Sequence, residues 1–264
     1  MTKLKHTFKT DLLFKMLFVK YPDLLKRLVA ELLKIPLESI EQFGIRNPEI
    51  PPESLGNKFC RLDINMMVNG QRVDLEVQVG NEGNYPERTL FHWAREYSTA
   101  LPSGKDFSQL PRTIIVSIMA FNLFGCTEYH SEFQALEVSR HTPLTDKMSL
   151  QYFELKKLPD TAGNNLELWL KLFAANTEEE LEEINKMGVS IMNQAIGAYR
   201  SITASPEFQE IERLREKASH DEAQALHNVR MGIAQNMLKR DRPIDEIIED
   251  TGLSREVLEA LRND

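Results

Sequence analysis

CRLDINMMVNGQRVDLEVQVG, residues 60–80, contains two runs of alternating apolar and polar residues around a central Asn69-Gly70 pair. Asn-Gly between alternating runs is the strongest short signal for a β-hairpin, and it favours a two-residue type I′ turn. Such a turn fixes the register of the two strands, because Val68 must then face Gln71. We therefore expect Asp63 to lie directly opposite Glu76.

The alternation of side chains along a strand gives this hairpin two different faces. The polar face is predicted to hold Arg61, Asp63, Asn65, Met67, Arg72, Asp74, Glu76 and Gln78. The other face is wholly apolar and is predicted to pack on a core; its residues are Leu62, Ile64, Met66, Val68, Val73, Leu75, Val77 and Val79.

The acidic residues of the polar face indicate a metal site. Asp63 and Glu76 in directly opposed positions repel each other, and Asp74 in the adjacent pair adds a third negative charge. A divalent cation turns this repulsion into coordination, and Mg²⁺ prefers a few carboxylate oxygens together with several waters. Such an ion can polarise a phosphate and supply hydroxide for attack on it. The hairpin therefore predicts a metal-dependent nuclease site, with Asp63 and Glu76 at its centre and Gln78 on the same face.

Two structural interpretations compete with this prediction. Arg61 and Arg72 lie on the same face and could neutralise the carboxylates as salt bridges. An antiparallel hairpin with one hydrated face is also the usual outcome of such alternation. A merely structural hairpin would, however, more often place opposite charges in directly opposed positions.

Composition limits the class of protein. The chain has 264 residues and a formal net charge of −8, so it is not a generally basic nucleic-acid-binding protein. Two cysteines, Cys60 and Cys126, make no disulfide framework. No segment approaches about 18 uninterrupted apolar residues, so we expect no membrane span and a cytoplasmic location.

Periodicity along the chain predicts a mixed fold followed by a helical region. Helices are expected over residues 10–20, 22–34 and 86–100, and strands over 112–121, 132–139 and 149–155. After Pro159 the pattern is helical throughout. This order indicates an α+β or α/β protein with an all-α tail, which we divide into a core over 1–158 and a helical extension over 159–264.

The expected helix over 86–100 has an apolar stripe and a basic face. The stripe is predicted to contain Leu90, Trp93, Ala94 and Tyr97. The basic face holds Arg88, His92 and Arg95 at helical spacing. These side chains could hold phosphates near a metal ion, or they could form a solvated polar face.

The C-terminal end is predicted to form a long helix over 206–239 and then two short helices joined by Thr251-Gly252-Leu253-Ser254. A short helix pair with such a turn is compatible with a helix-turn-helix. Acidic residues nevertheless outnumber basic ones over 241–264, which is the wrong balance for phosphate binding. We therefore expect a packing module, or one that forms a homo-oligomer.

At these residues the chain resembles a known family. Asp63 followed by Glu76-Val77-Gln78 resembles the signature of the PD-(D/E)XK nucleases, in the variant where glutamine replaces the lysine. The resemblance to the PD-(D/E)XK family transposases, also called Rpn-type recombination-promoting nucleases, extends along nearly the whole chain. It includes Thr10-Asp11, Phe14-Lys15, Leu17-Phe18, Leu62-Asp63, 73–78, Glu87-Arg88, Trp93, Tyr97, 114–124, 233–238 and 251–254.

The resemblance implies an α/β, restriction-endonuclease-like fold, in which helices flank a mixed central sheet. It also implies Mg²⁺-dependent DNA cleavage, with Mn²⁺ as an alternative ion. The metal ligands would be Asp63, Glu76 and the backbone carbonyl of Val77, and Gln78 would lie beside the attacking water. Glutamine offers only a dipole where lysine offers a charge, so an inactive DNA-binding or protein-interaction module is the alternative. RNA cleavage would use the same residues.

The same resemblance supplies candidate DNA contacts. Arg88 matches a position of the family, and Arg95 lies on the same helix face. Lys15 is predicted to serve the active centre as a DNA contact, or otherwise to face water. No role is assigned to Asp74.

Overall fold

The computed structural model describes residues 2–47, 63–101 and 103–263. Contacts divide the chain into two compact units, and among the described residues the first ends at Gln209 and the second begins at Glu210. Within these ranges, no helix combines the length and the hydrophobicity needed to cross a membrane.

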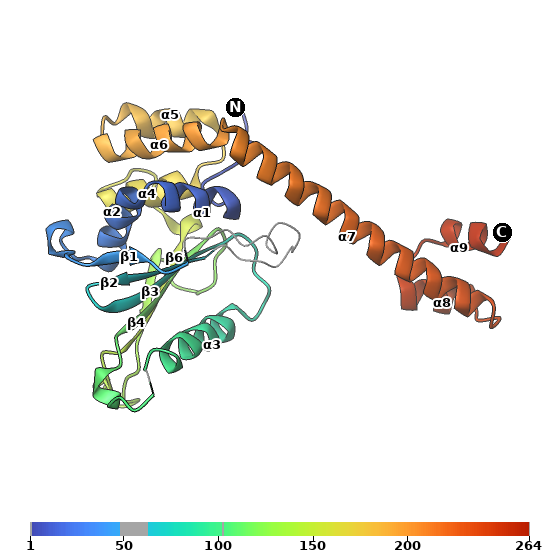
Figure 1. The fold of residues 1–264 in the computed structure, drawn as a ribbon, viewed down its shortest axis with the longest axis horizontal. Helices are drawn as coiled ribbons and strands as arrows, with labels where there is room; N and C mark the ends of the chain where they lie inside the picture. Colours follow the sequence, from blue (N-terminus) through green and yellow to red (C-terminus); the bar gives the residue numbers. More distant parts are fainter. Residues whose placement is uncertain (1, 48–62, 102, 264) are drawn as a thin grey trace. The chain divides into compact units, whose positions relative to one another are not determined.

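A mixed six-stranded sheet forms the centre of the first unit, in the order β1-β2-β3-β4-β6-β5 (Figure 1). The strands are β1 Phe43–Ile45, β2 Ile64–Val68, β3 Gln71–Gln78, β4 Thr113–Met119, β5 His130–Phe133 and β6 Met148–Glu154. β3, β4 and β6 run parallel to one another, and the other pairings are antiparallel. The predicted mixed sheet is thus confirmed.

The hairpin formed by β2 and β3 has the predicted register. Val68 pairs with Gln71, and Asn65 pairs with Asp74. Asn69 and Gly70 have φ values of 48° and 76°, and a type I′ turn requires positive φ at both positions. β2 begins at Ile64, so Asp63 immediately precedes the first paired residue.

The apolar face of the hairpin is buried over most of its length. Its core residues are at most 2% exposed: Ile64, Met66, Val68, Val73 and Leu75. The prediction is wrong for Val79, which is 59% exposed, because β3 ends at Gln78 and the residue lies beyond the sheet. Leu62 lies outside the described residues.

Helices flank both faces of the sheet (Figure 1). One side carries α1 Asp11–Lys20, α2 Pro22–Leu33, α4 Asn165–Ala174, α5 Glu178–Lys186 and α6 Ser190–Thr203. The other side carries α3 Tyr85–Ser98, which connects the parallel strands β3 and β4. The first three helices predicted from the sequence are therefore confirmed.

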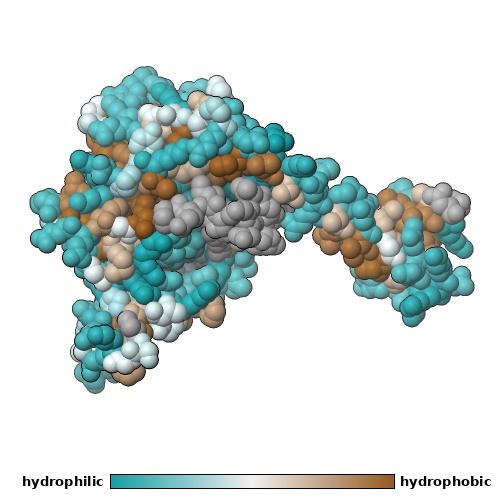
Figure 2. Space-filling view, in the orientation of Figure 1, coloured by the Kyte–Doolittle hydropathy of each residue, from teal (hydrophilic) through white to brown (hydrophobic). Residues whose placement is uncertain are grey.

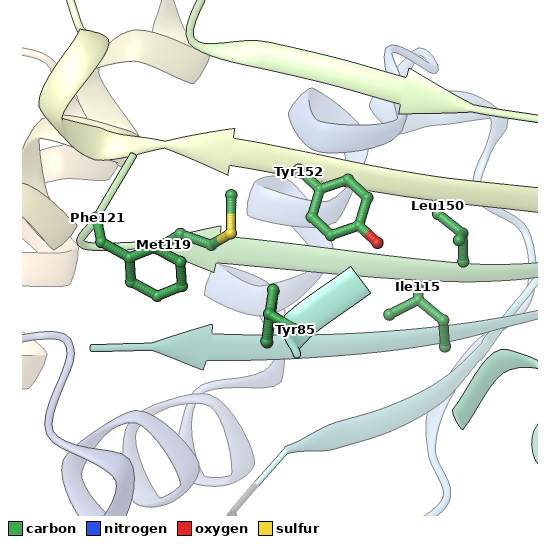
Figure 3. Close-up of a cluster of buried hydrophobic side chains, with 6 residues drawn as sticks. All are labelled: Tyr85, Ile115, Met119, Phe121, Leu150 and Tyr152. Atoms are coloured by element: carbon green, nitrogen blue, oxygen red, sulfur yellow. The ribbon is translucent and has the colours of Figure 1, made fainter. Parts of the chain in front are cut away.

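Helix α3 covers a cluster of buried side chains on the polar side of the hairpin (Figure 3). The cluster consists of Tyr85, Ile115, Met119, Phe121, Leu150 and Tyr152. The predicted apolar stripe of α3 is wrong for Leu90 and Ala94, which are exposed, whereas Tyr85 and Thr89 are buried. The helix turns a partly polar face towards the sheet, and hydrophobic periodicity does not detect such a face.

Two strand predictions have different outcomes. Residues 149–155 correspond to β6, but the strand expected over 132–139 is only His130–Phe133. Val138 is 88% exposed, because the alternating run continues past the last residue that pairs with β6. The three-residue strand β1 was not predicted from the sequence.

The second unit contains most of α7 Pro206–Leu238, then α8 Ile244–Thr251 and α9 Arg255–Asn263. Gly252 ends α8 with φ 65°, as its position in the turn predicted. A small core of Ala234, Ile247, Leu253 and Leu258 joins these helices. Figure 2 shows hydrophobic surface on these C-terminal helices, and three α7 side chains are about half exposed: Leu226, Val229 and Ile233.

Helices α4, α5 and α6 belong to the same compact unit as the sheet. The sequence analysis placed them in the helical extension after residue 158. That boundary of the nuclease-like core stays a prediction.

Candidate active site

The two central carboxylates lie together at the open end of the hairpin. Asp63 immediately precedes β2, and Glu76 lies near the carboxyl end of β3 on the same face. Burial raises the pKa of Asp63, and the charge of Glu76 raises it further. Burial is thus the larger cause, and the repulsion expected from the sequence is the smaller one.

Two buried hydroxyl groups orient the Glu76 carboxylate. The Tyr85 hydroxyl donates to Glu76 Oε1 at 2.5 Å, and Ser117 Oγ donates to the same oxygen at 3.0 Å. Neither donor residue is exposed. Burial raises the pKa of Tyr85 well above its ordinary value, followed by the charge of Glu76, so the phenol remains a hydrogen-bond donor. The sheet and α3 thus fix Glu76 from two directions.

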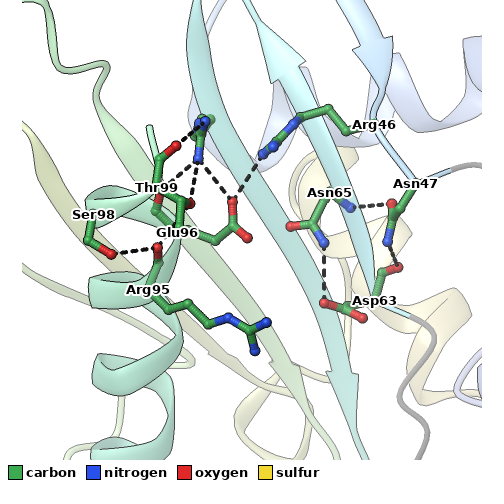
Figure 4. A network of polar contacts seen from close by, with 9 residues as sticks. Arg46, Asn47, Asp63, Asn65, Arg95, Glu96, Ser98 and Thr99 are labelled. Atoms are coloured by element: carbon green, nitrogen blue, oxygen red, sulfur yellow. Dashed lines mark hydrogen bonds and ion pairs between the residues drawn. The ribbon is translucent and has the colours of Figure 1, made fainter. Parts of the chain in front are cut away.

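Asp63 is held mainly through its backbone carbonyl. Lys15 Nζ donates to this oxygen at 3.0 Å, and Asn47 Nδ2 donates to it at 3.1 Å. Asn65 Nδ2 is 3.5 Å from Asp63 Oδ2 (Figure 4). Lys15, predicted to contact DNA, is only 1% exposed. Its ammonium contacts the residue that carries one of the two central carboxylates.

A third carboxylate, Asp74, is buried beside the other two. It is 8% exposed, and its Oδ1 has no hydrogen-bond partner among the residues that the structure describes. Burial raises its pKa well above the ordinary value, and the charges of Asp63 and Glu76 raise it further. The sequence placed Asp74 on this face but gave no sign that the side chain is covered.

Gln78 lies on the same face, but its side-chain amide forms a hydrogen bond with the backbone two residues further along the chain. Gln78 Nε2 donates to the backbone oxygen of Gly80 at 2.8 Å, and the side chain is 8% exposed. Val77, the predicted carbonyl ligand, is half-buried.

Arg72 does not neutralise the carboxylates in the way that the salt-bridge interpretation required. Arg72 donates to the backbone oxygen of Glu96 at 2.7 Å, and to Thr99 Oγ1 at 3.3 Å. Arg46 also pairs with Glu96 (Figure 4). That interpretation is therefore wrong for Arg72, while Arg61 lies outside the described residues.

The basic face of α3 lies partly against the acidic residues. The Arg88 guanidinium stacks 4.5 Å from the centre of the Tyr85 ring and pairs with Glu82 at 2.9 Å. Two further Arg88 nitrogens, Nε and one Nη, are buried and have no hydrogen-bond partner within the described part of the chain. His92 is close enough for its charge to lower the pKa of Asp63. Arg95 is exposed.

The donor set of the site suits a small, hydrated divalent ion. No group of three or more His, Cys, Asp or Glu side chains arranged to hold a metal occurs in the described part of the chain. Mg²⁺ does not need such a cage, because it keeps several waters and is commonly bound through one or two carboxylates. Asp63 and Glu76, with an uncompensated Asp74 carboxyl beside them, fit this requirement.

Three contributors to this site were not identified from the sequence: Tyr85, Ser117 and Asn47. Ser117 carried the clearest signal, since it is a polar residue inside the otherwise apolar run of β4. Tyr85 and Asn47 lie in segments with no periodic pattern that indicates a site.

A mixed sheet with helices on both faces, and a hairpin that carries Asp63 and Glu76-x-Gln78, defines the PD-(D/E)XK nuclease class. The family model described as PD-(D/E)XK nuclease family transposase matches residues 8–229, and the chain belongs to this family. Comparison with curated proteins and with solved structures gives no significant match. The resemblance inferred from the sequence is thereby confirmed, and the family points to a nuclease-type function.

Proposed function

We propose that this protein is a Mg²⁺-dependent DNA endonuclease of the recombination-promoting, transposase-associated type, with Mn²⁺ as an alternative ion. The observation that carries the proposal is the pairing of Asp63 with Glu76, whose Oε1 accepts hydrogen bonds from Tyr85 and Ser117. In a purely structural role, two carboxylates this close would only destabilise the fold through their repulsion. A bound cation would be coordinated by both and would neutralise them.

Asp63, Glu76 and the carbonyl oxygen of Val77 would hold the ion. When bound, Mg²⁺ supplies an activated water and charge neutralisation at a phosphate. Tyr85 and Ser117 keep Glu76 in one orientation, so that little reorganisation is needed when the ion and DNA arrive.

Arg88 and Arg95 are the proposed contacts to the DNA backbone. Two Arg88 nitrogens have no partner among the described residues and are donors of the kind that bind phosphate oxygens, and Arg95 is exposed on the same helix. We place the protein in the cytoplasm and propose homo-oligomerisation through the C-terminal helices. The half-exposed α7 side chains Leu226, Val229 and Ile233 support the second proposal.

One observation favours an alternative, a catalytically inactive DNA-binding or protein-interaction module. The amide of Gln78 is bound to Gly80, so position 78 supplies no charge, and one of its two N–H donors is already used. RNA as the substrate stays compatible with the same residues.

The discriminating experiment is a cation titration with a cleavage assay on plasmid DNA. We expect calorimetric binding of Mg²⁺ or Mn²⁺ and cation-dependent conversion of supercoiled plasmid to nicked or linear forms. Binding to DNA in EDTA without any cleavage in either ion would support the inactive module. A parallel assay on a structured RNA separates the two nucleic acids.

A further inference from the structure

Lys15 is a buried lysine in the first helix of the chain. Its side chain is 1% exposed, and the neighbouring residues of α1 from Leu12 to Phe18 are apolar and also buried. Burying an ammonium group costs several kcal/mol unless it is paired and hydrogen-bonded. Packing alone therefore does not explain why the Lys15 ammonium group is buried.

The contacts of Lys15 lead to the candidate active site. Lys15 Nζ donates to the backbone oxygen of Asp63 at 3.0 Å. Its positive charge also acts on the Asp63 carboxylate. The two residues are 48 positions apart in the chain, so the fold brings this charge to the carboxylates from outside the hairpin.

The other polar groups near the carboxylates have different partners. Gln78 donates to Gly80, Arg72 donates to Glu96, and Arg88 pairs with Glu82. Glutamine has no charge with which to balance negative charge that develops on a phosphate. Lys15 thus combines a positive charge, burial and direct contact with Asp63.

We propose that Lys15 supplies the positive charge of the active site and holds Asp63 in place, a role that position 78 cannot fill in this chain. The inference rests on the proposed nuclease function and replaces the expectation that Lys15 binds the DNA backbone. Lys15 is a positioning residue, because its observed contact is with Asp63.

Lys9 provides a matched control on the same N-terminal segment. Its Nζ donates to the backbone oxygens of Phe173, Ala174 and Ala175 at 2.6, 3.1 and 3.3 Å, at the end of α4. Burial lowers its pKa to about 8. Lys9 is therefore a half-buried structural lysine that caps the end of a helix and does not contact the carboxylates.

The test compares K15M, K15Q and K9M with the parent protein. Thermal unfolding reports stability, calorimetry with Mn²⁺ reports cation affinity, and single-turnover cleavage of plasmid at saturating Mn²⁺ reports the rate. K15Q can keep a donor towards the Asp63 carbonyl but removes the charge. For both Lys15 variants we expect cleavage to fall about 100-fold. Cation affinity should stay within about tenfold of the parent, because losing the positive charge beside Asp63 favours binding, whereas losing one of the two hydrogen bonds to its carbonyl oxygen opposes it.

If the role of Lys15 were merely structural, the cleavage rate and the cation affinity would fall together. For K9M we expect a lower unfolding temperature and an unchanged cleavage rate per folded molecule. Adding Q78K to K15M should restore part of the rate, because it places a lysine on the same face of the site.

Three outcomes would overturn the inference. The first is cleavage by K15Q or K15M within about threefold of the parent rate, well below the 100-fold loss expected of a missing charge. The second is loss of cation binding together with cleavage in folded variants, and the third is failure of both variants to fold, which would make Lys15 structural like Lys9. A parent that neither binds the cation nor cleaves DNA contradicts the proposed function itself, and the role of Lys15 falls with it.

Discussion

Two carboxylates near the carboxyl ends of parallel strands have different electrostatic surroundings. Glu76 lies near the end of β3 and Glu154 ends β6, and the register Gln78–Met119–Glu154 places both on the face under α3. Glu154 is fully buried, pairs with Lys157 at 2.6 Å, and accepts from the backbone N–H of Leu123 at 2.6 Å. Glu76, by contrast, lies beside two further carboxylates, Asp63 and Asp74.

The contrast separates a carboxylate that stabilises the fold from those kept for binding. Lys157 and the backbone N–H groups of Leu123 and Phe124 compensate the charge of Glu154, so this side chain is satisfied without a ligand. Asp74 has a buried oxygen with no hydrogen-bond partner in the ranges that the structure describes, and Asp63 has a raised pKa. Such incompleteness costs stability, and it is a common property of functional sites.

Asp63→Ala is the change with the largest expected effect, and it tests whether the hairpin carboxylates serve binding. We expect cleavage to fall about 1,000-fold or more, which corresponds to about 4 kcal/mol. Stability in EDTA should be equal or higher, because one of the repelling charges is removed. Mg²⁺ should raise the unfolding temperature of the parent far more than that of the variant, since only binding to the folded state shifts unfolding. A destabilised variant that still cleaved DNA would remove Asp63 from the site.

Glu154→Ala tests the other half of the comparison. This change leaves the backbone N–H groups of Leu123 and Phe124 without their acceptor. We expect a loss of about 3 kcal/mol in the free energy of unfolding. Denaturant unfolding in EDTA measures it, and added Mg²⁺ should stabilise this variant as much as the parent. Little change in stability would show that the two carboxylates do not differ as described.

The sequence was sufficient for the hairpin and insufficient for its surroundings. Asn69-Gly70 and strict alternation determine turn, register and face through local geometry, so Asp63, Asp74, Glu76 and Gln78 could be placed on one face. The contact between Lys15 and Asp63 joins α1 to the start of β2. Contacts of this kind depend on tertiary packing, which periodicity does not report.

Two further gaps have the same physical origin. The buried face of α3 carries Tyr85 and Thr89, so a search for an apolar stripe selected Leu90 and Ala94 instead. Glu154 follows an ordinary strand pattern, and its partners lie in a loop after β4 and in the turn after β6. Only the fold distinguishes this ion-paired carboxylate from the cluster of three carboxylates on the hairpin.

Tyr85→Phe sharpens the comparison with a smaller effect. Removing the hydroxyl deletes one of the two hydrogen bonds that orient Glu76 Oε1. We expect cation affinity to weaken about tenfold, as for other groups that orient a metal ligand. The matched control is Tyr129→Phe, since the Tyr129 hydroxyl donates to Glu167 at 3.2 Å, outside the candidate site. Calorimetry should show unchanged cation binding for this control, and equal effects of the two changes would contradict an orienting role for Tyr85.

The smallest expected effect is that of Asp74→Asn on the pH dependence of stability. The folded-state pKa of Asp74 is raised, first by burial and then by the charges of Asp63 and Glu76. A raised carboxyl pKa gives its full stability below the unfolded value near 4, and this contribution is lost as pH rises through the folded pKa. In EDTA, the parent should therefore be less stable at pH 8 than at pH 5. Asparagine cannot ionise, so the free energy of unfolding of the variant should fall less between pH 5 and pH 8. At pH 8 it should exceed that of the parent by about 1 kcal/mol. Urea unfolding at both pH values measures this difference. An identical pH dependence in both proteins would mean that Asp74 carries no uncompensated charge, and its resemblance to Glu154 would then be closer than its resemblance to Asp63.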